Sequence, residues 1–169
     1  MMDTPVYTVA ILTVSDRAAQ GRREDLSGPA LRESLTTLAG ATVVDEAIVP
    51  DDVSAIEGAL RHWVAQGVDL VLTTGGTGFA PRDVTPEATR RVVDREAPGL
   101  SEAMRAASLA HTPHAVLSRA VSGIADGTLI INLPGSPRAA RENLEAILPA
   151  LPHGLAKLKG DPSECGSPP

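Results

Sequence analysis

The sequence predicts an α/β fold in which helices cover both faces of a mainly parallel β-sheet. Short β-rich apolar runs alternate along the chain with longer segments whose apolar residues recur at helical spacing. Glycine-rich loops follow two of these runs, where the strands of such a sheet end and where ligands bind. The chain has 169 residues, enough to bury a core, and we expect a single domain over residues 1–160.

The first half of the chain is expected to contain two strands and two helices. Tyr7 to Val14 and Ala41 to Val49 are the two β-rich runs. Gly28-Pro29 opens the helix between them, and three leucines share one face of it: Leu31, Leu35 and Leu38. A second helix follows and ends at Gly67. Its apolar residues keep helical spacing: Val53, Ile56, Leu60, Trp63 and Val64.

The second half continues the alternation. Three strands are expected: Asp69 to Thr73, Val121 to Ile124 and Thr128 to Asn132. Asp126-Gly127 joins the last two as a hairpin, which adds a local antiparallel piece to the sheet. Four helices are expected: one from Thr85-Pro86-Glu87, one from Ser101 to Leu109, one from Ser136-Pro137 to Leu148, and one from Leu151 to Lys159.

The composition excludes several classes of function. A net charge of −6 and a pI of about 5.1 argue against a protein that binds nucleic acid by neutralising phosphates. One Phe, one Tyr and one Trp offer no surface on which bases could stack. We expect no membrane span and no signal peptide, and therefore a cytoplasmic protein. The single cysteine, Cys165, lies in residues 161–169, a Pro/Ser-rich tail that we expect to be disordered.

The densest functional signal is the loop Thr73-Thr74-Gly75-Gly76-Thr77-Gly78, directly after the third apolar run. Glycines there allow backbone N–H groups to converge on an anion, and the threonine hydroxyls add donors. Pro81-Arg82-Asp83-Val84-Thr85-Pro86 then places a cation and a carboxylate beside the loop. This layout predicts a site for a phosphorylated ligand with a metal. A tight structural turn is the alternative.

Two common phosphate-binding motifs do not fit this loop. A Walker A motif requires Gly-Lys followed by Ser or Thr, and the loop has no lysine. In the dinucleotide fingerprint a third glycine would follow Gly76-Thr77-Gly78, at the position where this chain has Pro81. The loop is therefore neither a Walker A motif nor a dinucleotide fingerprint.

Several further motifs follow one another along the chain. Asn132-Leu133-Pro134-Gly135-Ser136-Pro137 forms a second loop, and shorter matches are Ser15-Asp16-Arg17, Pro98-Gly99 and Leu117-Ser118-Arg119. Together with the first loop they closely resemble the molybdopterin adenylyltransferase family of the MogA/MoaB type. That family includes domains of the plant molybdenum-cofactor enzyme and of gephyrin. The resemblance covers about residues 6–160 and so implies a single molybdopterin-binding domain.

The resemblance implies a fold, a reaction and partners. The fold is a three-layer α/β/α sandwich with a mostly parallel sheet and a small antiparallel hairpin. Family members use Mg-ATP to adenylylate the terminal phosphate of molybdopterin, release pyrophosphate, and pass the product to a molybdenum-insertion enzyme. The implied cofactor is Mg²⁺, with ATP as co-substrate, and the implied assembly is a homotrimer, with hexamers in one branch. The alternative is a molybdopterin-binding protein without robust adenylyltransferase activity.

The resemblance assigns catalysis and metal binding to two carboxylates, Asp51 and Asp83. Mg²⁺ usually takes one or two carboxylates together with phosphate oxygens and water. Pro50-Asp51 also precedes a helix, so a helix cap is the alternative role for Asp51, although Asp52 is the better candidate for that cap. The alternative role for Asp83 is a salt bridge with Arg82.

The remaining implied site residues fall into two groups. The first loop and the pterin side are expected to bind phosphate and substrate through Thr74, Gly75, Gly76, Thr77, Gly78, Ser108, Ser118 and Arg119. The end of the first strand and the second loop are expected to bind nucleotide through Ser15, Asp16, Asn132, Pro134, Gly135 and Ser136. Without the resemblance, Ser108 would be an ordinary helix residue and Ser118-Arg119 an exposed polar pair.

Overall fold

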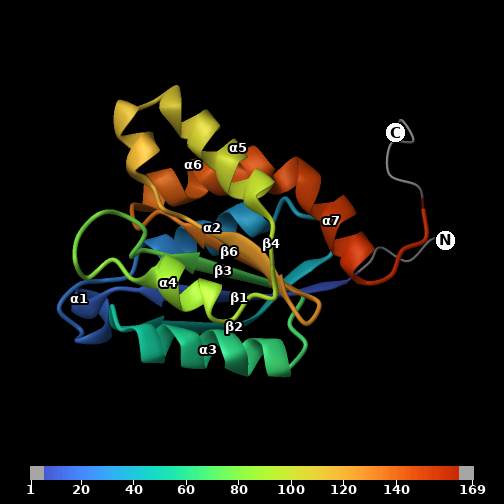
Figure 1. Cartoon of the computed structure of the whole chain (residues 1–169), viewed down its shortest axis with the longest axis horizontal. Helices are drawn as coiled ribbons and strands as arrows, with labels where there is room; N and C mark the ends of the chain where they lie inside the picture. Colours follow the sequence, from blue (N-terminus) through green and yellow to red (C-terminus); the bar gives the residue numbers. More distant parts are fainter. Residues whose placement is uncertain (1–5, 164–169) are drawn as a thin grey trace.

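The computed structural model describes residues 6–163, which form one six-stranded sheet with helices on both faces (Figure 1). The strands are β1 (Tyr7–Val14), β2 (Ala41–Val49), β3 (Leu70–Thr74), β4 (Arg95–Glu96), β5 (Ser122–Ala125) and β6 (Thr128–Leu133). The α-helices are α1 (Asp16–Ala19), α2 (Ser27–Leu35), α3 (Val53–Ala65), α4 (Thr85–Arg90), α5 (Pro98–Leu109), α6 (Pro137–Ile147) and α7 (Leu151–Leu158). Two 3₁₀ segments are η1 (Pro113–Leu117) and η2 (Leu148–Ala150).

The strand order is β2-β1-β3-β6-β5-β4. The first four strands of this order are parallel, and β5 and β4 continue the sheet antiparallel. Asp126 and Gly127 form the hairpin turn with φ of 43° and 85°, the left-handed values that this dipeptide favours. The predicted fold class, a mostly parallel α/β/α sandwich with a small antiparallel hairpin, is therefore confirmed.

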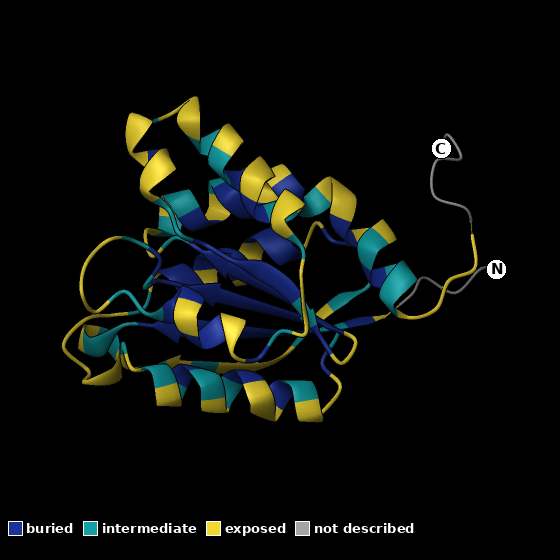
Figure 2. Cartoon of the chain, in the orientation of Figure 1, coloured by how far each residue is buried: buried dark blue, intermediate teal, exposed yellow. Residues whose placement is uncertain are grey.

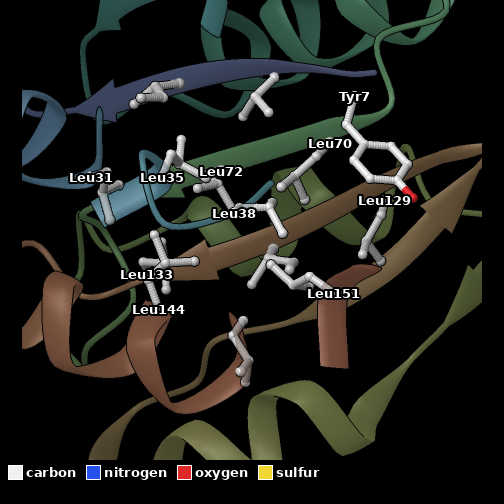
Figure 3. Packing of buried hydrophobic residues seen from close by; sticks show 14 of the residues in the cluster. Tyr7, Leu31, Leu35, Leu38, Leu70, Leu72, Leu129, Leu133, Leu144 and Leu151 are labelled. Carbon is white, nitrogen blue, oxygen red and sulfur yellow. The ribbon is translucent and has the colours of Figure 1, made fainter. Parts of the chain in front are cut away.

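Two hydrophobic cores lie on opposite faces of the sheet (Figure 2). Alternate residues of β1 divide between them, as the two-residue period of a strand requires. Tyr7, Val9 and Ile11 pack with α2, α5, α6 and α7 (Figure 3), whereas Ala10, Leu12 and Val14 pack with α3 and α4. Leucine, isoleucine and valine supply most of this packing, and the single Tyr and the single Trp are also buried in it.

The observed elements differ from the predicted ones mainly at short segments. The expected strands are shifted by at most one residue, and α5 begins at Pro98 rather than Ser101 because proline suits the first position of a helix. Four short elements were not expected: α1, β4, η1 and η2. Each spans at most five residues, too few to show a hydrophobic period.

The last helix is tied to the sheet by Asp69, just before β3. Its Oδ2 accepts hydrogen bonds from the backbone N–H of Thr8 at 2.8 Å and from the Thr8 hydroxyl at 2.9 Å, and its Oδ1 pairs with Lys159 Nζ at 3.0 Å. Burial acts to raise the pKa of Asp69, but these bonds outweigh it and the pKa lies below its usual 3.8.

No helix within residues 6–163 combines the length and the apolar character needed to cross a membrane. Asp161 to Ser163 form neither helix nor strand. The rest of the expected disordered tail, residues 164–169 with Cys165, lies outside the described residues.

Candidate functional site

A cleft opens at the carboxyl ends of β1 and β3, where the strand order reverses because β2 lies on the other side of β1. Its volume is about 390 Å³, and we call it the polar cleft. It is lined by residues from both glycine loops, from the end of β1 and from the end of β2. The expected site residues among them are Ser15, Asp51, Thr74, Gly75, Gly76, Gly135 and Ser136.

The two glycine loops interlock beside this cleft. The Thr74 hydroxyl donates to the carbonyl O of Pro134 at 2.6 Å. A Cβ added to Gly135 would lie 3.2 Å from the Cα of Gly75, and one added to Gly75 would lie 2.3 Å from the carbonyl O of Val14. Gly75 also has φ of +103°. Position 75 therefore requires glycine, both because its backbone is left-handed and because it lies so close to β1.

The first loop is anchored by the start of α4. The backbone N–H of Thr85 donates to the carbonyl O of Gly76 at 3.1 Å, and the Thr85 hydroxyl donates to that of Gly75 at 2.9 Å. Two carbonyls of the loop are therefore bonded within the protein itself. These contacts hold the loop against the start of α4.

A second hollow of about 510 Å³ lies on the other side of the loops, and we call it the apolar cavity. Phe79, Ala115 and Leu117 contribute to its apolar surface. Five of the expected site residues also line it: Thr77, Gly78, Ser108, Ser118 and Pro134. Asn143 of α6 lines the cavity too, and its side-chain amide donates to the Ser108 hydroxyl at 2.7 Å. The two glycine loops thus separate two adjacent cavities of different polarity.

Asp16 and Asp51 hold each other through reciprocal hydrogen bonds. The N–H of Asp16 donates to Asp51 Oδ2 at 2.8 Å, and the N–H of Asp51 donates to Asp16 Oδ1 at 3.0 Å. Asp52, not Asp51, caps α3 by accepting from the N–H of Ala55 at 2.9 Å. The alternative role of Asp51 as the cap of that helix is therefore wrong.

Arg82 pairs with Asp16, at 2.5 Å between Nε and Oδ2. The alternative of a salt bridge between Arg82 and Asp83 is therefore wrong. The hydrogen bond from Arg82 is the main reason why the pKa of Asp16 lies below its usual value. Asp16 itself does not line the polar cleft.

Asp83 lies in the exposed loop that follows Gly78. Its Oδ2 accepts from the N–H of Ala80 at 2.9 Å, and it lines neither cavity. The guanidinium of Arg119 holds this loop: it donates to the carbonyl O of Gly78 at 2.8 Å and to that of Asp83, and it pairs with Glu87. Arg119 also lines neither cavity, so its visible role is to support the loop.

Asn132 is fully buried and contributes no surface to either cavity. Its amide nitrogen donates to the hydroxyls of Thr73 and Thr89 at 3.0 and 2.9 Å, and its oxygen accepts from the N–H of Val121 at 3.1 Å. Asn132 thus braces β6 against its neighbours just before the second loop begins.

Sequence reasoning missed the segment before α2, which forms one wall of the polar cleft: Arg23, Glu24, Asp25, Leu26 and Ser27. Asp25 Oδ1 accepts from the N–H groups of Ser27 and Gly28 at 3.0 and 3.1 Å, which caps α2. An Asp placed two residues before Ser-Gly-Pro is a capping signal, and it could have located this wall.

Comparison with known proteins gives consistent similarities. Residues 10–153 match the model of a family described as a probable molybdopterin binding domain. A molybdopterin adenylyltransferase from Helicobacter pylori (strain J99) is 45% identical over 155 residues, which cover 90% of this chain and 88% of that protein. Gephyrin from Dictyostelium discoideum is 43% identical over 165 residues, but these make up only 23% of gephyrin's own length.

Among solved structures, the molybdopterin biosynthesis enzyme MoaB from Thermus thermophilus superposes with a TM-score of 0.88. It is 51% identical, and the match covers 94% of this chain and all of that one. The similarity therefore extends over the sheet, both helical layers and both glycine loops.

Proposed function

Because the chain belongs to the family of probable molybdopterin-binding domains, through residues 10–153, we propose that it is a molybdopterin adenylyltransferase. In this reaction the terminal phosphate of molybdopterin receives the adenylyl group of ATP, and pyrophosphate leaves. The observation that carries the proposal is the pair of adjacent cavities. One is polar, one is apolar, and both are lined by the same two glycine loops.

The two cavities suit the two substrates. The polar cleft offers glycine backbone, hydroxyls and the start of α6 at Ser136, which favour a nucleotide phosphate chain. In the apolar cavity, the side chains of Phe79 and Leu117 would contact a flat ring system, and the hydroxyls of Ser108 and Ser118 would form hydrogen bonds with it. A phosphate reaching from the apolar cavity past the loops would meet the α-phosphate of a nucleotide in the cleft.

This reaction requires the protein to position its two substrates and does not require a protein nucleophile. An oxygen of the molybdopterin phosphate forms a bond to the α-phosphorus of ATP, and the bond from that phosphorus to the β-phosphate oxygen breaks. The attacking oxygen is already an anion, so no side chain has to remove its proton. The protein must hold two polyanions in line and stabilise charge that grows on the leaving pyrophosphate.

The carboxylates of the polar cleft fit a bound Mg²⁺. Glu24, Asp25 and Asp51 line it against one cation, Arg23, so a polyphosphate would be repelled unless a divalent cation came with it. Asp51 Oδ1 faces Gly76, 3.4 Å from where a Cβ on that glycine would be. We assign Asp51 to hold the ion, which would neutralise phosphate charge when bound. Asp83 lines neither cavity, and we assign it to the same ion on the family resemblance alone.

The test is pyrophosphate release from Mg-ATP in the presence of molybdopterin. Asp51→Asn and Asp83→Asn are expected to lose turnover while they still bind molybdopterin. Asp52→Asn is the matched control, because Asp52 is the neighbouring acid and its contact is the α3 cap, so this variant should keep turnover. Unchanged turnover in Asp51→Asn or Asp83→Asn would remove that residue from the mechanism.

The alternative function is molybdopterin binding without catalysis. It would be favoured if the wild type bound molybdopterin tightly and released no pyrophosphate. The presence of both acids, Asp51 and Asp83, favours the enzyme.

We further propose that the protein works as a homotrimer and passes its product to a molybdenum-insertion enzyme, in the cytoplasm, where ATP is available. Exposed apolar side chains outside both cavities provide surface for such contacts, among them Leu109 and Val116. Sedimentation equilibrium tests the assembly, and a monomer at micromolar concentration would contradict the trimer.

A further inference from the structure

The geometry points to Asp16 as a positioning residue that fixes the carboxylate of Asp51, rather than as a direct nucleotide contact. This inference rests on the proposed function only in treating Asp51 as a carboxylate that holds a divalent cation. Its structural part, that Asp16 determines where the Asp51 side chain lies, stands on contacts within the protein.

The pair extends the ladder between two parallel strands. The last β1–β2 hydrogen bond joins the N–H of Ser15 to the carbonyl O of Val49 at 2.9 Å. Past this bond, the two chain segments are joined by the reciprocal hydrogen bonds between Asp16 and Asp51, at 2.8 and 3.0 Å. Each carboxylate thus satisfies the backbone N–H of the other residue, which neither strand can pair any longer.

These bonds divide the two oxygens of Asp51 between two tasks. Oδ2 accepts the N–H of Asp16, whereas Oδ1 faces Gly76 in the polar cleft. A carboxylate with one oxygen committed to a backbone donor keeps one orientation, and the other oxygen is then presented to a ligand in a fixed direction. Hydrogen-bond partners of metal-binding side chains commonly change metal affinity by about 10- to 100-fold when they are removed.

Asp16 also divides its oxygens between two partners. Oδ1 accepts from the N–H of Asp51, and Oδ2 accepts from Arg82 at 2.5 Å. Arg82 is well exposed, with 66% of its side chain accessible, so the ion pair is screened by solvent and holds little by itself. The acceptor at Oδ1, rather than the negative charge, should therefore carry the positioning effect.

Three variants separate these contributions. Asp16→Ala removes both acceptors. Asp16→Asn keeps an oxygen for the N–H of Asp51 and removes the charge. Arg82→Gln removes only the ion pair and leaves both aspartates.

The first readout is hydrogen exchange at the backbone amide of position 16 in the ligand-free protein. Every variant keeps this amide and its acceptor, Asp51, so the protection of the amide, corrected for intrinsic rates, reports whether the Asp51 carboxylate stays in place. We expect protection to fall at least about tenfold in Asp16→Ala and to persist in Asp16→Asn and Arg82→Gln. The second readout is Mn²⁺ binding by electron paramagnetic resonance with a non-hydrolysable ATP analogue. Here Asp16→Ala should weaken binding about 10- to 100-fold, and Asp16→Asn should restore it.

Two results would overturn the inference. One is full protection of position 16, or unchanged Mn²⁺ affinity, in Asp16→Ala. The other is equal damage from Asp16→Asn and Asp16→Ala, which would mean that charge matters rather than the acceptor. Failure of the proposed function looks different: the wild type would release no pyrophosphate with molybdopterin, while the exchange and Mn²⁺ results followed the expected order.

Discussion

Replacing Gly75 by alanine tests how closely the first glycine loop is held against β1. An added Cβ would lie 2.3 Å from the backbone carbonyl O of Val14, so the loop or the strand must move. The left-handed φ of +103° costs an L-residue roughly 1–2 kcal/mol. Forcing extra volume into a packed contact adds about 1–3 kcal/mol. Gly75→Ala should therefore lower the free energy of unfolding by about 2–5 kcal/mol.

Gly67→Ala is the matched control. Gly67 has φ of +72°, but a Cβ there would meet no atom within 4 Å, so only the conformational cost of roughly 1–2 kcal/mol applies. Urea unfolding followed by fluorescence of the single tryptophan, Trp63, measures both variants. Equal destabilisation of the two variants would mean that the close approach of position 75 to Val14 costs no stability.

Three other side chains carry predictions that need no ligand. Asn132→Ala removes a hydrogen bond from each of three buried partners, of which the Thr89 hydroxyl keeps its bond to the carbonyl O of Thr85, and should cost about 2–4 kcal/mol in urea unfolding. A loss below about 1 kcal/mol would contradict the role of Asn132 as a brace. The lowered pKa of Asp69 implies stability that is fully present above its unfolded pKa of 3.8 and lost as the pH falls through the lower folded pKa. Asp69→Asn should therefore flatten the acid side of the stability profile, and an unchanged slope would mean that the bonds from Thr8 and Lys159 do not stabilise the ionised carboxylate of Asp69. Arg119→Lys loses the forked donor under the loop and should speed hydrogen exchange at Asp83, whose N–H bonds within that loop; unchanged exchange would mean that Arg119 does not hold the loop.

The strands and most helices were predictable because each carries a local signal. β1 is a short β-rich apolar run, and α3 has one apolar stripe at helical spacing, so both can be predicted from their own residues. The hairpin at Asp126-Gly127 and the cap at Asp52 were predictable for the same reason, since their chemistry lies within a few residues.

The sequence did not predict contacts between residues that lie far apart in the chain. Arg82 is adjacent to Asp83 but pairs with Asp16, 66 residues away, because the loop folds back over the end of β1. Asn132 belongs to a loop motif, yet the pleat of β6 turns its side chain into the core. The separation of the motif residues into a polar cleft and an apolar cavity also depends on how the two loops cross, which no local pattern encodes.

The most direct test of the proposed reaction follows the phosphorus atoms of ATP. The protein would be incubated with molybdopterin, Mg²⁺ and ATP labelled either at the α- or at the γ-phosphate. We expect the α-label to move to molybdopterin and the γ-label to leave as pyrophosphate, in equal amounts. Tight binding of molybdopterin with both labels still in ATP would contradict adenylyl transfer and indicate a binding protein.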